Sequence, residues 1–331
     1  MLRSFHLLLI FAVAASSTAV ACINEYGTTA SGNATLRAHN RVPTVIPIDI
    51  GRYREQIKIL TPKIESSPSH EDLSDLAVAH LYVGETQRSI ELLQQAESVT
   101  PGEYAVASNL GTALELAGRN EEALTWIEEG IRRNPDSHGG SEWVHANVLK
   151  AKAAMADDPR WLKDNSVTGL SFGDEPIPVF NTSLSSPNCP ESLVDVRAHL
   201  EHQLYERRSF IPGPDPIVAA LMFDLANATA LAYTVEDSRP IYAAAVELGY
   251  HDQTLVAHRL AALEALQSKN VLSGWTYETL ALAAICTILV VVVSCSVLWR
   301  YMRTRKATNH AMQRSGGRAV SDHGESTPAA R

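Results

Sequence analysis

Apolar residues recur with helical spacing along residues 104–135, in two amphipathic segments separated by a short break. In the first segment Leu110 and Leu114 fall on one helical face, and in the second Ala123 and Ile127 do the same. Small residues stand where two helices would approach closely, and large ones stand where they would fill the space between them. The pattern therefore predicts a pair of packed helices.

A second copy of this pattern precedes the first by one period of about 34 residues. Gly84 and Gly118 recur at this period, where a helix end needs a left-handed residue. Other positions one period apart are Ala77 and Gly111, Ser89 and Ala123, and Pro101 and Pro135. The chain is therefore expected to contain a helical repeat.

Residues 70–135 resemble two tetratricopeptide repeats, although His80 stands where that pattern usually has tyrosine or a large apolar residue. The whole arrangement, from ACINEYG through the repeats to GWTYETLALAAICTIL, resembles exported repeat proteins of bacteria with a C-terminal membrane anchor. The resemblance implies an all-α fold, namely a short, interrupted tetratricopeptide-type helical repeat stack plus one C-terminal transmembrane helix. It specifies architecture and leaves the ligand open.

Beyond a third predicted helix at residues 141–155, Pro, Gly, Asn and Ser interrupt the array. Helical spacing returns at 193–210 and again from Pro216, where a degenerate repeat is predicted from Met222, Leu225, Ala226, Ser238, Tyr242 and Ala245. The expected segments are a signal peptide (1–21), an irregular N-terminal arm and capping helix (22–69), repeats (70–155), a loop-rich insert and helix (156–215), degenerate repeat-like helices and cap (216–268), a transmembrane helix (276–299) and a basic tail (300–331).

Both ends of the chain carry membrane signals. Residues 1–21 combine Arg3, an apolar run and a small-residue cleavage site, which is typical of an export signal. Residues 279–299 are uncharged, long enough to span a bilayer, and followed by a basic tail. We therefore expect a single-pass protein with its body on the periplasmic side of a bacterial inner membrane and its C-terminal tail in the cytoplasm.

Charge and cysteines narrow the range of functions. The net charge of −9 becomes about −15 on the exported body once Arg3 and the basic tail are removed, which argues against nucleic acid as a partner. Cys22 is either lipidated after signal cleavage or paired with Cys189 in an oxidising compartment. No CxxC motif is present, so thiol redox chemistry and c-type haem attachment have no motif here.

No catalytic or metal motif stands out. His70, His80, His138 and His145 form neither HxxxH nor HExxH, and GxxxxGK[ST] and GxGxxG do not occur. The clustered glutamates of residues 121–129 are typical of a solvated helix face. We therefore expect no enzymatic activity, no cofactor and no bound metal.

A groove is the better candidate for function. In tetratricopeptide stacks the first helix of each pair lines the concave side, and the resemblance transfers that role to particular positions of this chain. The candidates are Ser74, Val78, Tyr82, Ser108, Asn109, Thr112, Glu115 and Glu142. Their polar, slightly acidic character favours a basic or neutral extended peptide. The alternative is a groove that is solvated or occupied by the chain's own insert.

The leading hypothesis is a membrane-anchored scaffold that holds an envelope protein or peptide in this groove. A second hypothesis is an accessory envelope enzyme or metal-binding protein, with a site in residues 142–215 that uses Glu142, His145 or Cys189. A third is a sensor that signals to the basic tail, although a tail of about 30 residues is too short for a domain.

Overall fold

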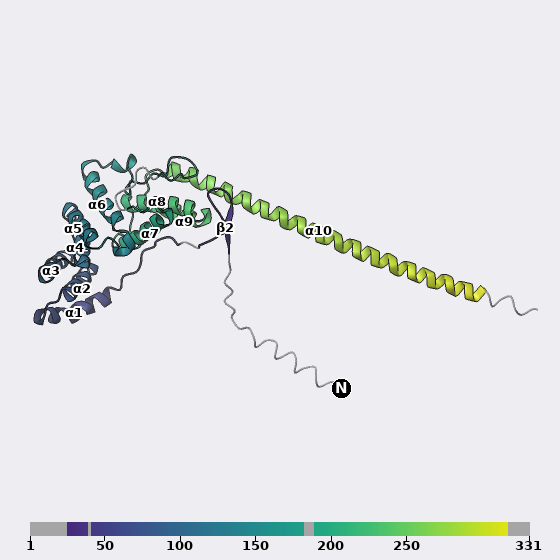
Figure 1. Cartoon of the computed structure of the whole chain (residues 1–331), viewed down its shortest axis with the longest axis horizontal. Helices are drawn as coiled ribbons and strands as arrows, with labels where there is room; N and C mark the ends of the chain where they lie inside the picture. The colour runs from purple at the N-terminus through teal and green to yellow at the C-terminus, as the bar shows by residue number, and fades with distance from the viewer. Residues whose placement is uncertain (1–24, 39–40, 182–188, 317–331) are drawn as a thin grey trace, which may run out of the picture. The chain divides into compact units, whose positions relative to one another are not determined.

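Two helix pairs with the same spacing form the N-terminal part of the fold. In this computed structural model, which describes residues 25–38, 41–181 and 189–316, α2 begins at residue 70 and α4 at 104, while α3 begins at 86 and α5 at 120. Both helices therefore recur after 34 residues, as the sequence predicts. Successive helices pack side by side (Figure 1). The bounds are His70–Tyr82 for α2, Thr86–Val99 for α3, Tyr104–Leu116 for α4 and Asn120–Arg133 for α5.

Glycine is needed at two kinds of place in these pairs. A Cβ atom added to Gly111 would lie 2.6 Å from Ile127 Cδ1 and 3.2 Å from the Ala123 carbonyl oxygen, so α4 and α5 touch where only hydrogen fits. Gly118, which follows α4, has φ of 77°, and its counterpart Gly84 has φ of 87°. A residue with a Cβ is strained in that left-handed conformation, so glycine ends the first helix of both pairs.

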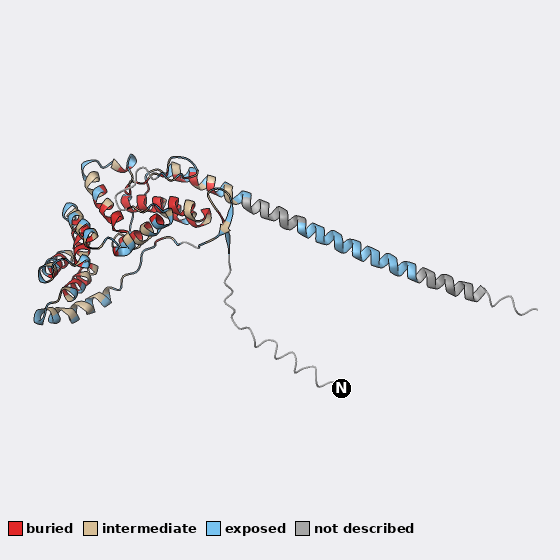
Figure 2. Cartoon of the chain, in the orientation of Figure 1, coloured by how far each residue is buried: buried red, intermediate tan, exposed pale blue. Residues whose placement is uncertain are grey.

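The second part of the fold is built around α8, which is buried from Ile217 to Ala230 (Figure 2). Helices α7 and α9 pack against it, so this apolar helix belongs to the protein core. All six residues that predicted a degenerate repeat here are buried. The bounds are Glu142–Asp157 for α6, Leu193–Phe210 for α7, Pro216–Ala232 for α8 and Val235–Glu247 for α9, with short 3₁₀ helices η1 at Ser137–Gly140 and η2 at Trp161–Lys163. The predicted all-α fold class is confirmed.

A small hairpin stands in the segment that the sequence predicts to be irregular. Strands β1, Tyr26–Thr28, and β2, Ala34–Leu36, pair antiparallel. The hairpin is tied to α9, because the Thr28 amide donates to Glu236 Oε2 at 2.7 Å and Arg37 Nη2 donates to Asp237 Oδ1 at 2.8 Å. These tertiary bonds, which span about 200 residues, have no local sequence signal.

Helix α1, Ile50–Ser66, packs alongside α2. The sequence predicts a helix start near Tyr53, but the helix begins earlier, where the Asp49 side chain accepts a hydrogen bond from the Arg52 amide and caps it. It also continues past Pro62, where the sequence predicts a kink or an end. Ile57, Leu60 and Ile64 pack against the hydrophobic core of the repeats, which places the tertiary contacts of α1 on both sides of the proline.

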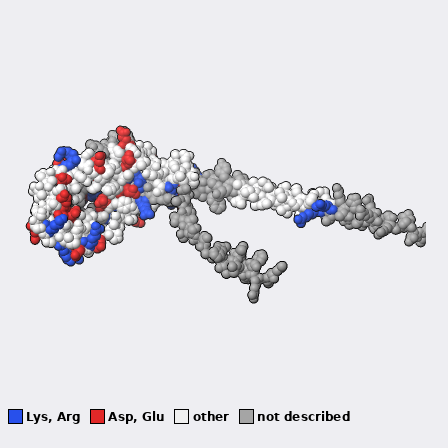
Figure 3. All heavy atoms as spheres, turned by 60° about the horizontal axis from the view of Figure 1, so that its bottom comes forward, with Lys and Arg blue, Asp and Glu red and all other residues white. Residues whose placement is uncertain are grey.

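Helix α10 runs from Gln253 to Gly316 and contains the apolar stretch Ala281–Arg303, with a mean hydropathy of 2.8. By length and composition this stretch could cross a membrane, and none of it is buried by protein, as its pale blue colour in Figure 2 shows. Figure 3 shows its uncharged surface and the basic residues at its end, which include Arg300 and Arg303. The chain divides into two compact units, residues 1–270 and 271–331. The predicted signal peptide and Cys22 lie outside the described residues.

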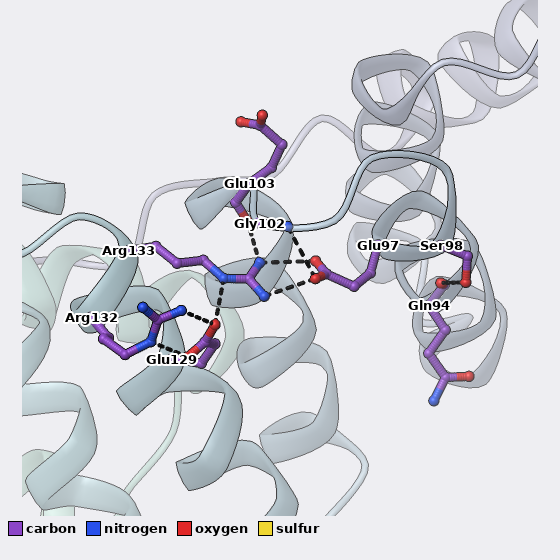
Figure 4. Close-up of polar contacts among 8 residues, drawn as sticks. All are labelled: Gln94, Glu97, Ser98, Gly102, Glu103, Glu129, Arg132 and Arg133. Carbon is purple, nitrogen blue, oxygen red and sulfur yellow. Dashed lines mark hydrogen bonds and ion pairs between the residues drawn. The ribbon is translucent and has the colours of Figure 1, made fainter.

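Arg133 joins the two repeats (Figure 4). Its guanidinium donates two hydrogen bonds to Glu97 of α3, at 2.9 and 2.8 Å, and a third to the Glu103 carbonyl oxygen at 2.8 Å. The Arg133 side chain is 9% exposed, whereas that of Arg132 is 71% exposed and bonds to Glu129 on its own helix. A buried, bidentate ion pair such as Arg133 with Glu97 fixes the relative position of the two helices. An exposed pair within one helix, such as Arg132 with Glu129, contributes little to stability.

This contrast gives a stability prediction. Arg133→Gln should lower the free energy of unfolding by about 1–3 kcal/mol, because it leaves Glu97 and the Glu103 carbonyl without their charged donor. Arg132→Gln, the matched control, should change it by less than about 0.5 kcal/mol. Chemical denaturation of the full-length chain in detergent measures both values. Equal effects of the two substitutions would contradict the role of Arg133.

Candidate functional site

The candidate groove residues lie on α2 and α4, the first helices of the two pairs, and on α6, and they differ in accessibility. Ser74 is largely buried and accepts a hydrogen bond from Asn109 Nδ2 at 3.1 Å, which links α2 to α4. Ser108 is buried, and its Oγ faces Gly130 of α5. Val78, Asn109 and Thr112 are half-buried. The groove face that solvent reaches on α2 and α4 therefore includes these three positions.

Tyr82 at the end of α2 is covered by aromatic rings from two other helices. Its ring stacks on Tyr53 of α1 at a centroid distance of 4.3 Å and on Phe210 of α7 at 4.8 Å. Burial is the main cause that raises the pKa of the Tyr82 hydroxyl to about 12, so it remains neutral at physiological pH. Tyr82 thus holds α1 and α7 against the edge of the groove.

Glu115 of α4 is buried and paired with three cations. Its Oε1 accepts hydrogen bonds from Lys152 Nζ and Arg207 Nη1, each at 2.6 Å, and its Oε2 lies 2.7 Å from His145 Nε2. Burial alone would raise the pKa of Glu115, but the charges of Arg207, His145 and Lys152 hold it well below its usual value. The ionised carboxylate therefore connects α4 to both α6 and α7.

Glu142 of α6 extends the same network. It hydrogen-bonds through Oε1 to His138 Nδ1, and its Oε2 lies 3.5 Å from His145 Nδ1. Burial acts to raise the pKa of Glu142, but the bonds to the two histidines lower it to about 2. The carboxylates in turn raise the pKa of His138, mainly through its bond to Glu142, and that of His145 against the effect of burial. The chain His138, Glu142, His145, Glu115, Arg207 is thus a continuous series of opposite charges.

A small pocket opens beside this network, lined by Thr112, Glu115, Leu116, His138, Glu142, His145, Gln203, Glu206, Arg207, Phe210 and Ile211. Its volume is about 70 Å³. Because a water molecule occupies about 30 Å³ in the liquid, the pocket has room for very few waters. Side chains of α7, namely Gln203, Glu206, Arg207 and Phe210, line this space beside α4 and α6.

The sequence did not identify the α7 residues that reach this face. Gln203 and Arg207 are buried although both are strongly polar. Gln203 donates to Ser141 Oγ at 3.0 Å, and Arg207 pairs with Glu115, from which it is separated by 92 residues. Their spacing of four residues places them on one helical face. That spacing is the only sign in the sequence that the two residues share a face, and it does not reveal their burial, because an exposed polar stripe has the same pattern.

The residues of the alternative site do not converge. Glu142 and His145 belong to the charged network, whereas Cys189 packs against the hydrophobic core around α8. Burial raises the pKa of the Cys189 thiol to about 11, which disfavours the reactive thiolate. Within the part of the chain that the structure describes, no group of three or more His, Cys, Asp or Glu side chains could hold a metal ion.

The histidines give a prediction of pH dependence. The pKa values of His138 and His145 are raised in the folded chain, so their stabilising effect is complete below about pH 6.5 and is lost as pH rises through the raised values. Glu142 contributes above pH 4.5 and loses its contribution as pH falls towards about 2. The network is therefore most stabilising between these limits.

The melting temperature of the unaltered chain should be lower at pH 8.5 than at pH 5.5. In His145→Gln this difference should be smaller by about 2–4 °C, which corresponds to roughly 1 kcal/mol in the free energy of unfolding. His258→Gln, which replaces an exposed histidine of α10, is the control and should leave the difference unchanged. Thermal unfolding of the full-length chain in detergent at both pH values provides the comparison. An unchanged pH profile in His145→Gln would show that the network does not titrate as described.

Solved structures include chains that resemble this one. No protein-family model matches the chain, and no curated protein matches it in sequence. Among solved structures, the chain is similar to the crystal structure of a thermophilic TPR protein in Thermus thermophilus. The match has 16% identity and a TM-score of 0.32, and it covers 65% of this chain and 92% of the other.

Proposed function

We propose that the helix-pair stack is a protein-interaction scaffold and that a partner binds along the open side of α2 and α4. Val78, Asn109 and Thr112 supply the contact surface in this proposal, since they are half-buried positions on successive first helices. Glu115 acts from within by pairing with Arg207 of α7, and Glu142 supports this network through His145. The observation that carries the proposal is this short accessible strip, which lies beside the residues of α4 and α6 that α7 covers.

The chemistry of the strip favours a particular kind of partner. Val78 offers an apolar contact, while Asn109 and Thr112 offer an amide and a hydroxyl. The body carries excess negative charge, which favours approach of a neutral or basic segment. An extended segment of a protein or peptide fits a strip with little depth, because it can bind by contacts along its length.

Site-specific photocrosslinking tests this assignment. A photoreactive residue placed at Val78 or Thr112 of the full-length chain in native membranes should capture a partner protein. The same residue at Gln94, which is exposed on the second helix α3, is the matched control and should not capture it. Capture of the same protein with equal yield from all three positions would rule out the strip as the binding surface.

We also propose that Ala281–Arg303 anchors the protein in a membrane with its body outside the cytoplasm. A core helix of a soluble protein is mostly buried, whereas this stretch exposes side chains such as Val290 and Val292 throughout. Such a continuous apolar surface is unfavourable in water and favourable in lipid. The basic residues at its C-terminal end, Arg300 and Arg303, and those that follow it favour a cytoplasmic tail.

Membrane insertion can be tested at the centre of the stretch. Val292→Arg should weaken insertion, because an arginine at the centre of a membrane helix costs about 2.5–3.5 kcal/mol in insertion experiments. Val292→Leu is the control and should insert normally. Alkaline carbonate extraction should release more of the arginine variant than of the control. Complete release of the unaltered chain would contradict anchoring, and protease protection of the body in spheroplasts would contradict the orientation.

A further inference from the structure

A larger pocket lies away from the groove, between the loop of residues 162–174, helix α8 and the turn that precedes α10. Its volume is about 570 Å³. Binding pockets for small molecules usually measure about 300–1,000 Å³, so this space is large enough for a ligand. Nothing in the proposed scaffold function uses it.

Arg259 of α10 holds the wall of this pocket in place. The side chain is fully buried and donates hydrogen bonds to the carbonyl oxygens of Phe172, Gly173 and Glu175. Its guanidinium also lies over the Phe223 ring, 5.0 Å from the centroid. A buried cation with several hydrogen bonds is costly to displace, so the loop has a defined conformation against α8.

Asp224 of α8 lines the pocket and is 7% exposed. Its Oδ2 accepts a hydrogen bond from Thr168 Oγ1 at 2.7 Å. Thr168 is itself fixed, because its Oγ1 lies 3.0 Å from Ser166 Oγ and its carbonyl oxygen accepts a hydrogen bond from Asn147 Nδ2 at 3.2 Å. The loop thus positions a carboxylate deep in the pocket.

Tyr250 forms an aromatic wall of the pocket. It is 9% exposed, and its ring stacks on Phe223 at a centroid distance of 4.1 Å. Burial and the negative charges of Asp174, Asp224 and Asp252 raise the pKa of this hydroxyl. Tyr250 therefore contributes both an aromatic surface and a polar hydroxyl to the lining of the pocket.

We propose that this pocket binds a primary alkylammonium group, with Asp224 as its counter-ion and the Tyr250 hydroxyl as a second hydrogen-bond acceptor. Three carboxylates near Tyr250 attract a cation, and the aromatic wall suits an alkyl chain that ends in positive charge. A metal ion fits less well, because no three ligating side chains converge here or elsewhere in the described ranges. The group belongs either to a free diamine or to a lysine side chain of a peptide.

The protonation of Asp224 supports this assignment. Burial raises the pKa of Asp224 to about 7, against the opposing effects of the Thr168 hydrogen bond and the Arg259 charge. The other titratable or charged groups around the pocket are Lys163, Asp164 and Asp174 of the loop, Tyr242 of α9, Tyr250, His251 and Asp252 before α10, and Arg259 of α10. A carboxyl with this pKa is about one-tenth ionised at pH 6 and about nine-tenths ionised at pH 8. Amine affinity should therefore rise almost tenfold over this range.

Calorimetric titration of the full-length chain in detergent with cadaverine, at pH 6 and pH 8, tests the proposal. Asp224→Asn keeps the shape of the side chain and should weaken binding at pH 8 by at least about tenfold. Tyr250→Phe removes the hydroxyl alone and should weaken it by roughly three- to tenfold. Asp75→Asn, an exposed carboxylate of α2, is the control and should change binding less than about twofold.

A second titration with an acetylated, lysine-containing hexapeptide distinguishes the two sources of the amine. Tighter binding of cadaverine identifies a free amine, and tighter binding of the peptide identifies a lysine side chain. Absence of binding by both probes to the folded chain at pH 8 would overturn the proposal, as would equal cadaverine affinity of Asp224→Asn and the unaltered chain. Circular dichroism confirms that each variant is folded. Because the groove is not involved, this result is independent of the crosslinking result.

Discussion

The buried carboxylate of Glu115 is the constraint on which the arrangement of the helices depends. An ionised carboxylate is very unfavourable in a protein interior unless cations and hydrogen bonds replace its water. Here the replacements come from α6, through His145 and Lys152, and from α7, through Arg207. One side chain of the second repeat therefore requires two later helices to be in position. The aromatic stack of Tyr53, Tyr82 and Phe210 adds an apolar contact at the end of the same face.

This arrangement explains why the repeat array stops after a few helices. After α6 the chain does not form the expected antiparallel partner but continues through the loop of residues 162–174. Helix α7 then packs on both α6 and α8, and so it joins the repeat core to the second core around α8. The side chains that make this junction also line the space beside α4 and α6. An accessible strip on α2 and α4 remains beside this space, and a separate pocket forms where the loop folds over α8.

The sequence predicts local and periodic features of this protein well. Gly118 recurs as Gly84 and reports a left-handed turn, and Gly111 stands at a small-residue position shared with Ala77 and reports close packing. The burial of Tyr242 follows from its repeat position. Features that depend on distant partners have no such signal. In the sequence, Arg207 and Gln203 have the spacing of an exposed polar stripe, so their burial could not be predicted. Asp224 is a single acidic residue in an apolar helix, and its environment depends on Thr168 and Arg259, which are distant in sequence. The groove candidates were predicted from the repeat pattern alone, and that pattern does not indicate whether α7 covers part of this face.

The contact between Arg207 and Glu115 also has a consequence for the order of folding. It spans 92 residues, whereas α2 to α5 pack against near neighbours in sequence. Local helix pairs close at a smaller entropic cost than contacts across long loops, so the two repeats assemble before α7 can dock. During synthesis from the N-terminus, Glu115 stays hydrated and the whole concave face stays uncovered until the later helices emerge. This face is thus fully exposed only in the nascent chain, and the docking of α7, which covers part of it, is a late step of folding.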